Sequence, residues 1–346
     1  MNPINIELFS QELASGLLLA FLGFALAMFF TPIYTSLAYK YKFWKKQRTA
    51  STTGETAKVF QKLHAAKHTR HIPTMAGIIT VLSVVIATVV FNMSREQTWL
   101  PLVAMVGAGA VGLLDDIINI RGVGQGVAGL NSRLKLLLIT VVALIGGWYF
   151  YSKLGYDSIH VPFVGEWVLG IWLIPLFTFV VVATANAVNI SDGLDGLAGG
   201  LLSIAFGAYG VIAFMQGNVG IAGFCVTLLG ALLSYVWFNI YPARFFMGDV
   251  GSFALGTALG VVAMLTNTLT LLPIIGLVFV AEAGSSLIQI LSKKFLHRKI
   301  FISAPVHHHL EAIGWPEVKV TMRFWVIGAV SGVAGIIIAL VGGYIL

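Results

Sequence analysis

Residues 166–188 read Glu-Trp-Val-Leu-Gly-Ile-Trp-Leu-Ile-Pro-Leu-Phe-Thr-Phe-Val-Val-Val-Ala-Thr-Ala-Asn-Ala-Val, and only the first of them is charged. A helix of about 20 apolar residues spans the hydrocarbon core of a bilayer, so this stretch predicts a transmembrane helix. The rest of the 346-residue chain has the same character: 58% of its residues are hydrophobic, 10% are charged, and the mean hydropathy is +0.91. Soluble domains carry about 25% charged residues. The composition therefore excludes an ordinary soluble globule, a disordered chain and a fibrous repeat.

The same length criterion predicts ten spans in one all-α transmembrane domain that covers residues 1–346. No stretch alternates in polarity as the strands of a membrane barrel do. The 38 glycines suit close helix packing in lipid. The predicted spans are 14–37, 73–93, 99–114, 134–151, 166–188, 196–215, 218–238, 250–267, 271–292 and 323–346.

Lys and Arg are concentrated in alternate connections between the spans. Nineteen of them fall in four connections, whereas the connections of the other side hold only Arg95 and Lys153. The positive-inside rule therefore predicts that the basic connections face the cytoplasm and that both termini lie outside. The four basic connections are 38–72, 115–135, 239–249 and 293–323.

The formal net charge of +7 is explained by these basic loops. Nucleic acid is not expected as a partner, because the aromatic residues of the first basic loop suit an interfacial belt instead. The single cysteine, Cys225, lies in an apolar run and provides neither a disulfide framework nor a cysteine metal site.

Four polar clusters each follow an odd-numbered span, so all four are expected at the cytoplasmic face. Ionisable and amide groups beside membrane spans are functional candidates, and their shared side predicts one convergent site. The clusters are Asp115-Asp116, Asn186–Asp195, Asn239–Ser252 and Pro305–Glu311.

Each cluster has a structural alternative. Asp115-Asp116 could mark a helix end, or could bind Mg²⁺ or phosphate, because Mg²⁺ prefers one or two carboxylates with phosphate oxygens. The polar residues of 186–195 recur every third position, so neighbours share a helix face. That stripe could recognise metal, ribose or base, or could cap a helix. Asp249, in Met-Gly-Asp-Val-Gly-Ser, could cap the eighth span or sit where glycines admit a phosphate.

The run His307-His308-His309 favours phosphate recognition by imidazole donors over zinc, because adjacent histidines point in different directions. Glu282 is the one carboxylate well inside a span. We expect it to be a buried, paired structural group rather than part of a cavity lining.

Together these motifs resemble the polyprenyl-phosphate N-acetylhexosamine-1-phosphate transferases. The resemblance covers nearly the whole chain and depends on five segments in order. They are Pro73–Gly77, Asp115-Asp116, Asn186–Ala198, Phe246–Ser252 and Pro305–Glu311.

The uninterrupted histidine run, followed by Gly314-Trp315, is similar to the muramoyl branch of that family. The resemblance implies ten spans, a cytoplasmic active site in the bacterial plasma membrane, and Mg²⁺ as cofactor. It implies transfer of phospho-MurNAc-pentapeptide from UDP-MurNAc-pentapeptide to undecaprenyl phosphate in the bilayer, which gives lipid I and UMP for peptidoglycan synthesis. It also implies a possible homodimer.

The same resemblance assigns roles to individual positions of this chain. Asp249 and Asp116 would bind the metal, and Asp115, Asp116, Asp249 and His308 would form the catalytic set. Phe246 could stack on the base, and Asp192 could accept its N–H. The substrate-binding set would be Asn189, Asp192, Asp195, Phe246, Gly248, Ser252, His307, His309, Thr74, Arg70, Arg133, Lys135, Asn239 and Gln289.

Two positions depart from the family pattern, which usually has lysine where this chain has Thr69 and Asn119. Arg70 could replace the first, and the later basic pair persists as Arg133 and Lys135. Because the acceptor phosphate is largely ionised at neutral pH, direct attack is favoured over a covalent aspartyl intermediate.

Two other activities stay open at the level of sequence. A related enzyme would transfer GlcNAc-1-phosphate from UDP-GlcNAc to the same lipid. A secondary transporter is less favoured, because transporters place coupling charges near the midplane of the membrane and only Glu282 lies deep.

Overall fold

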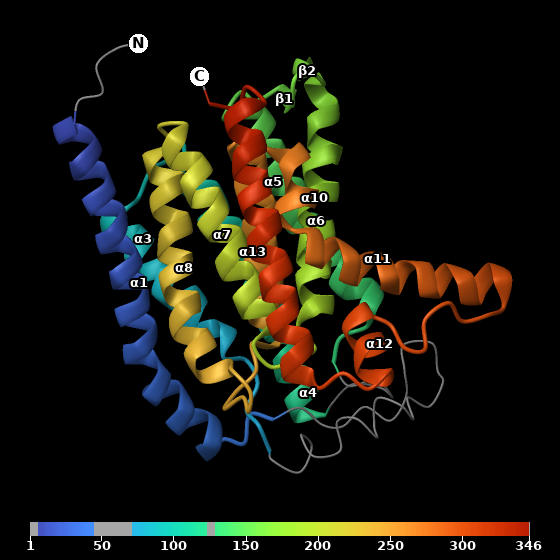
Figure 1. Cartoon of the computed structure of the whole chain (residues 1–346). Coiled ribbons are helices and arrows are strands. Elements are labelled where there is room, and N and C mark those ends of the chain that lie inside the picture. The colour runs from blue at the N-terminus through green and yellow to red at the C-terminus, as the bar shows by residue number, and fades with distance from the viewer. Residues whose placement is uncertain (1–5, 45–70, 123–128, 346) are drawn as a thin grey trace.

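The computed structural model describes residues 6–44, 71–122 and 129–345. They form a bundle of long helices with one short hairpin (Figure 1). The long helices are α1 (Ile6–Lys40), α3 (Gly77–Phe91), α4 (Trp99–Arg121), α5 (Ser132–Ser152), α6 (Leu173–Ser191), α7 (Leu197–Met215), α8 (Val219–Asn239), α9 (Gly248–Leu265), α11 (Leu277–Leu291) and α13 (Glu317–Val341).

Within the described ranges, eight helices are long and apolar enough to cross a membrane, and a ninth span is possible if a bent pair counts as one. The 15-residue α3 is apolar but shorter. Each of the ten predicted spans overlaps one of these helical segments, although only eight or nine of those segments meet the length criterion for a span. The prediction of an all-α polytopic membrane protein is confirmed.

The predicted span 271–292 is not one continuous helix. Residues Leu269–Ile275, which contain η2 (Leu269–Leu271) and α10 (Leu272–Ile275), are bent by 83° from residues Leu277–Leu296. The second part comprises α11 and a π-helical turn, η3 (Ser292–Leu296), and it runs sideways out of the bundle (Figure 1). Hydropathy detects the apolar composition of such a segment but not a change of direction within it.

The start of the predicted 166–188 span is also wrong. Strands β1 (Ser158–Val161) and β2 (Gly165–Val168) pair antiparallel, with Val161 opposite Gly165. The span begins only after this hairpin, with η1 (Gly170–Trp172) leading into α6. Residues 167–172 continue the apolar run of α6 without a break, so span length alone could not separate strand from helix.

Polar side chains tie the hairpin to the end of the bundle. His160 Nδ1 lies 3.0 Å from Glu166 Oε1, the Ser158 hydroxyl donates to Glu166 Oε2 at 2.7 Å, and the Asn267 amide donates to the same carboxylate. Partial burial opposes ionisation of Glu166, but these hydrogen bonds outweigh it and hold the pKa of Glu166 below its ordinary value.

Helix α9 is the centre of the bundle, and every one of its residues is buried. It packs against α3, α4, α6 and α7. Elsewhere α1 packs on α8, and a Cβ at Gly230 of α8 would lie 1.9 Å from the carbonyl oxygen of Ala20. Such contacts are possible only where a side chain is missing.

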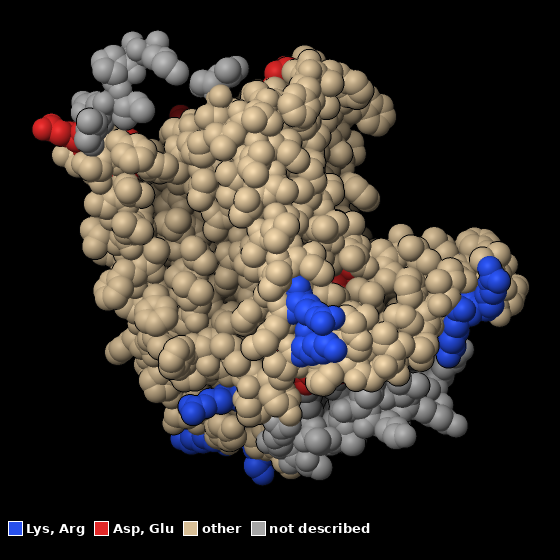
Figure 2. Space-filling view, viewed as in Figure 1, with Lys and Arg blue, Asp and Glu red and all other residues tan. Residues whose placement is uncertain are grey.

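The two ends of the bundle differ in charge. The start of α1, the end of α13 and the hairpin lie at one end, whereas α12 (Val306–Ala312) and the last turns of α4 lie at the other (Figure 1). On the face in Figure 2, Lys and Arg gather at the α12 end and at the far end of α11. The wide band above them is formed almost entirely by uncharged residues, as expected for a surface in contact with lipid.

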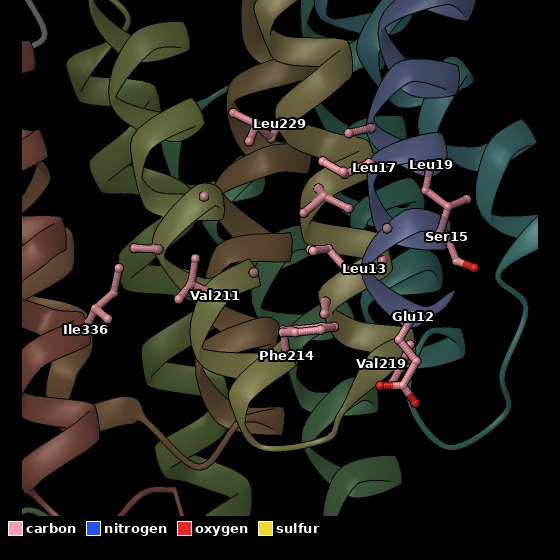
Figure 3. A pocket seen from close by; sticks show the side chains of 18 of the residues that line it. Glu12, Leu13, Ser15, Leu17, Leu19, Val211, Phe214, Val219, Leu229 and Ile336 are labelled. Carbon is pink, nitrogen blue, oxygen red and sulfur yellow. The ribbon is translucent and has the colours of Figure 1, made fainter. Parts of the chain in front are cut away.

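An apolar cavity of about 740 Å³ lies between α1, α7, α8 and α13. Figure 3 shows Leu13 and Leu17 of α1 facing the side of α7 that carries Val211 and Phe214. None of the polar clusters described above lines this cavity.

The α1–α8 contact generates a stability prediction. Gly230→Ala should destabilise the protein by about 1–3 kcal/mol, because the added methyl group overpacks a backbone contact. Thermal unfolding in detergent should show a lower Tm. The control is Gly16→Ala in α1, where a Cβ would meet no atom within 4 Å. Equal Tm values for the two variants would show that α1 and α8 are less closely packed.

The hairpin generates a pH prediction. Because the pKa of Glu166 is lowered in the fold, its contribution to stability is present above the ordinary glutamate pKa and is lost as the pH falls through the lowered value. Glu166→Gln should therefore reduce the Tm at pH 7, and the difference from the native chain should vanish well below about pH 4. A difference that stays constant with pH would show that Glu166 does not act through its charge.

Candidate active site

Two acidic motifs meet where α4 passes α9. A Cβ at Gly112 would lie 2.1 Å from the carbonyl oxygen of Asp249, so the two backbones touch. Asp115 and Asp116 follow Gly112 by about one helical turn and are fully buried. The expectation that these residues follow the third span is wrong, because α4 continues through them to Arg121.

Lys135 links the two motifs. Its Nζ lies 3.0 Å from Asp115 Oδ2 and 3.0 Å from Asp249 Oδ2. Asp115 Oδ1 also accepts the backbone N–H of Leu130 at 2.5 Å. Three helices (α4, α5 and α9) thus contribute one charge each to a cluster in which one ammonium group lies between two carboxylates.

Asp116 organises the start of α9. Its Oδ2 accepts the backbone N–H of Val250 at 3.0 Å, which places a carboxylate at a helix N-terminus. Gly248 has φ +75°, and a Cβ there would lie 2.6 Å from the same oxygen. The glycine before Asp249 is therefore required both by backbone conformation and by space.

The segment Pro73–Gly77 runs beside the residues that precede α9. Phe246 N–H donates to Pro73 O at 2.8 Å, Ala76 N–H donates to Phe246 O at 3.0 Å, and Gly77 N–H donates to Met247 O at 2.9 Å. These hydrogen bonds hold the Pro73–Gly77 motif against the Phe246–Ser252 motif.

Thr74 is buried within this pairing, and the hydroxyl of Tyr34 donates to its carbonyl oxygen. In the described part of the chain, Thr74 Oγ1 has no hydrogen-bond partner. Buried hydroxyls are normally satisfied, so this one is suited to a ligand. Tyr34 was missed at the level of sequence, because a tyrosine inside an apolar run gives no separate signal.

Asn189 connects the Asn186–Asp195 cluster to the Asn239–Ser252 cluster. Its Nδ2 donates to Ser252 Oγ at 2.8 Å, and Ser252 Oγ in turn donates to Gly248 O at 3.1 Å. Asp192 ends α6 and is half-buried. Asn189 therefore faces the start of α9, whereas Asn186, three residues earlier, lines a groove between α5 and α6.

Asp195 and Asn239 hold the chain that carries Phe246. Asp195 Oδ2 accepts Ala243 N–H at 3.0 Å. Asn239 Oδ1 accepts Gly196 N–H at 3.0 Å, and its Nδ2 donates to Phe245 O at 2.8 Å. These contacts are to backbone atoms and give both residues a positioning role.

Asp195 is also held from its backbone side. Its N–H donates to Glu317 Oε1 at 2.7 Å. The contact made by Glu317 was not predicted from the sequence, because this residue lies outside the motifs, six positions after Glu311.

The three histidines each have a different neighbour. His307 Nδ1 lies 2.6 Å from Glu282 Oε2, and both side chains are fully buried. His308 Nδ1 lies 2.8 Å from Glu311 Oε2, and His309 Nδ1 accepts the backbone N–H of Ile302 at 3.2 Å. The expectation that Glu282 is a buried, paired group is confirmed.

Helix α12, which carries the three histidines, contacts the Asn186–Asp195 cluster at Gly193. A Cβ at Gly193 would lie 2.4 Å from Nε2 of His307, so the ring packs directly on this backbone. Gly193 directly follows Asp192, and the histidines therefore join the same end of the bundle as the acidic motifs.

Two predicted residues, Arg133 and Gln289, do not join the cluster through contacts of this kind. Arg70 lies outside the described residues. The side chain of Arg133 is exposed at the start of α5. Gln289 is buried in α11, where it hydrogen bonds the backbone of Ile300 and Phe301 at 3.0–3.1 Å.

The acidic residues fit a magnesium ion. The described residues contain no set of three or more His, Cys, Asp or Glu side chains placed to bind one metal. Mg²⁺ needs only one or two carboxylates when substrate phosphate oxygens complete its shell. Asp249 and Asp115 already share one cation, Lys135, so this donor set attracts positive charge. The predicted pairing of Asp249 with Asp116 stays a prediction.

Comparison with known proteins shows the family of this chain. Residues 98–267 match the family model described as glycosyl transferase family 4. The chain is 38% identical to the phospho-N-acetylmuramoyl-pentapeptide-transferase of Chloroflexus aggregans, over 96% of this chain and 92% of that protein. It is 39% identical to the protein of that name from Geobacillus sp. (strain WCH70), over 92% and 95% of the two chains. The chain therefore belongs to the phospho-N-acetylmuramoyl-pentapeptide-transferase family.

Proposed function

We propose that this protein transfers phospho-MurNAc-pentapeptide from UDP-MurNAc-pentapeptide to undecaprenyl phosphate, releasing UMP and forming lipid I. The names of the similar proteins support this activity. The observation that carries the proposal from the structure is the position of Lys135. It lies between two carboxylates, and the residue that follows it, Leu136, lines an apolar groove.

The groove runs along α5 and α6 and has a volume of about 500 Å³. Its lining begins at Leu136, directly after Lys135, and includes Ile174, Phe179 and Val182. Asn186 lines the same groove. An isoprenoid chain suits this apolar lining, with its phosphate directed to the ammonium group of Lys135.

The reaction requires two anionic substrates to approach each other. An oxygen of the acceptor phosphate attacks the phosphorus bonded to the sugar, and the bond from that phosphorus to UMP breaks. Lys135 offsets repulsion between the substrates and stabilises charge on the leaving phosphate, as fixed cations do in phosphoryl transfer. The acceptor is largely ionised at neutral pH, so no covalent aspartyl intermediate is needed.

Asp249, together with Asp116, would hold the magnesium ion. When bound, the ion supplies positive charge that neutralises the diphosphate. Asp116 keeps the start of α9 in place through Val250 N–H. Asp115 orients Lys135 while it accepts Leu130 N–H.

The uridine side of the donor is assigned to residues around Phe246. Its ring can stack on the base, and Asp192 can accept the base N–H. Asn189 and Ser252 lie beside the start of α9 and can donate to phosphate or ribose oxygens. The unsatisfied hydroxyl of Thr74 supports a ligand contact on the same side.

His308 and His309 would contact the sugar phosphate, with His307 held by Glu282 and seated against Gly193. Arg133 and Arg70 would add positive charge near the substrates. Gln289 supports the loop that leads to α12 through its backbone contacts.

The site is proposed to face the cytoplasm of a bacterial plasma membrane, with both termini on the other side. Described cations such as Lys40, Lys42 and Arg244 lie at the site end of the bundle. Arg95 and Lys153 belong to connections of the other end. The positive-inside rule assigns the more basic end to the cytoplasm.

A UMP-release assay tests the reaction and its substrate. With Mg²⁺ and undecaprenyl phosphate, UDP-MurNAc-pentapeptide should release UMP, and UDP-GlcNAc should release far less. Asp249→Asn should lose nearly all activity because it removes a metal ligand and a partner of Lys135. Asp157→Asn, an exposed carboxylate beside the hairpin, is the matched control. Preference for UDP-GlcNAc would assign the protein to the related reaction.

The role of Lys135 is tested by charge removal. Lys135→Gln should lower the rate of UMP release by about 10²–10³-fold, the range typical of a lost electrostatic contact in a transition state. Lys135→Arg should retain more activity, because the charge persists. Lys153→Gln, an exposed lysine at the opposite end, should match the native chain. A native rate in a folded Lys135→Gln variant would remove this residue from the mechanism.

A further inference from the structure

The segment Leu277–Leu296, named here the α11 arm, projects from the bundle after the 83° bend. One of its faces is polar and is turned toward the protein. Ser285 Oγ accepts Val306 N–H at 3.0 Å, Gln289 Oε1 accepts Phe301 N–H at 3.0 Å, and Ser292 Oγ donates to Arg298 O at 2.8 Å. With the Glu282 contact to His307, these bonds hold the returning segment 298–307 against the arm.

The opposite face of the arm is apolar and uncovered by the described residues. Its exposed side chains include Leu287 (56%), Ile290 (51%), Phe295 (67%) and Leu296 (57%). A helix that turns its polar face inward and its apolar face outward is arranged for hydrocarbon around it rather than for water. We therefore expect this apolar face to contact the lipid of the bilayer.

The far end of the arm is strongly basic. Lys293, Lys294, Arg298 and Lys299 fall within seven residues, and no Asp or Glu occurs between Glu282 and Glu311. The side chains of Lys294, Arg298 and Lys299 are exposed. Figure 2 shows this basic group at the end of the arm, away from the other cations of that face.

We propose that the tip of the α11 arm is a binding site for the phosphate headgroup of an anionic glycerophospholipid, whose acyl chains lie along the apolar outer face. Long basic side chains on an apolar segment extend to the headgroup level while their stems stay in hydrocarbon. Each of them near an anionic surface strengthens binding by about fivefold. Apolar chains and a phosphate are the two parts of the ligand that the face and the tip accommodate.

Site-directed quenching tests this proposal on the full chain in vesicles. The only native cysteine, Cys225, is fully buried, so a thiol-reactive fluorophore should label Leu296→Cys selectively. The vesicles contain phosphatidylcholine with a small fraction of spin-labelled lipid, either phosphatidylglycerol or phosphatidylcholine. Quenching should be several-fold stronger with the phosphatidylglycerol. A label at Leu37→Cys, an exposed position on α1, gives the reference for bulk lipid.

Two double variants then test whether the lysines at the tip of the arm, and not other lysines at the same end of the bundle, cause the preference. Lys294→Gln with Lys299→Gln should reduce the several-fold preference for phosphatidylglycerol to nearly none, because two of the exposed charges are lost. Lys40→Gln with Lys42→Gln removes two exposed lysines at the same end of the bundle and should leave it unchanged.

Equal quenching by the two lipids, or an unchanged preference in the tip variant, would overturn the proposal. Complete displacement of spin-labelled phosphatidylglycerol by an equimolar amount of polyprenyl phosphate would overturn it in favour of the acceptor lipid. The readout needs no turnover, so it can fail or succeed independently of the proposed reaction.

Discussion

One ammonium group between two carboxylates fixes the polar end of this bundle. Lys135 of α5 lies 3.0 Å from a carboxylate of α4 and 3.0 Å from a carboxylate of α9. Burying two carboxylates against a partly buried ammonium group is costly, and a buried ion pair is seldom the most stable solution for a helix contact. Its presence is therefore better explained by chemistry than by stability. The contact also requires that α4 and α9 touch, and Gly112 permits this.

Much of the fold could be predicted because a membrane restricts what a chain can do. Backbone groups inside lipid must be paired within helices or closed barrels, so an apolar run of sufficient length nearly dictates its structure. The predictions were wrong where the length and polarity of a segment do not show whether the backbone bends or forms a strand. The end of the hairpin before α6 and the bend before α11 both fall within apolar runs of sequence. Charge at the end of an apolar run normally marks a helix end, but here Lys135 pairs with Asp115 and Val250 N–H donates to Asp116 Oδ2, so both aspartates lie within α4.

The site could be predicted as a set of motifs but not as a set of roles. Connections of one parity must emerge at the same side of a bundle, which explains why four distant clusters come together. Sequence cannot show whether an amide or carboxylate faces a ligand or a backbone. Asp195, Asn239 and Gln289 were expected to bind substrate, and all three hydrogen bond backbone atoms of neighbouring loops. Thr74 presents the opposite case, since its buried hydroxyl lacks a partner in the described part of the chain.

The α11 arm positions α12, which carries the three histidines, at the candidate active site. Glu282, Ser285, Gln289 and Ser292 recur at spacings of three, four and three along α11, which places them on one helical face. Each contacts the segment that returns to α12. That segment cannot leave the arm without exposing a polar stripe to an apolar environment, which is energetically unfavourable. The position of His307 against Gly193 is therefore set by the bend at Gly276 as much as by its own helix. A polar stripe at helical spacing inside an apolar span is thus a sign that the span packs against its own chain as well as against lipid.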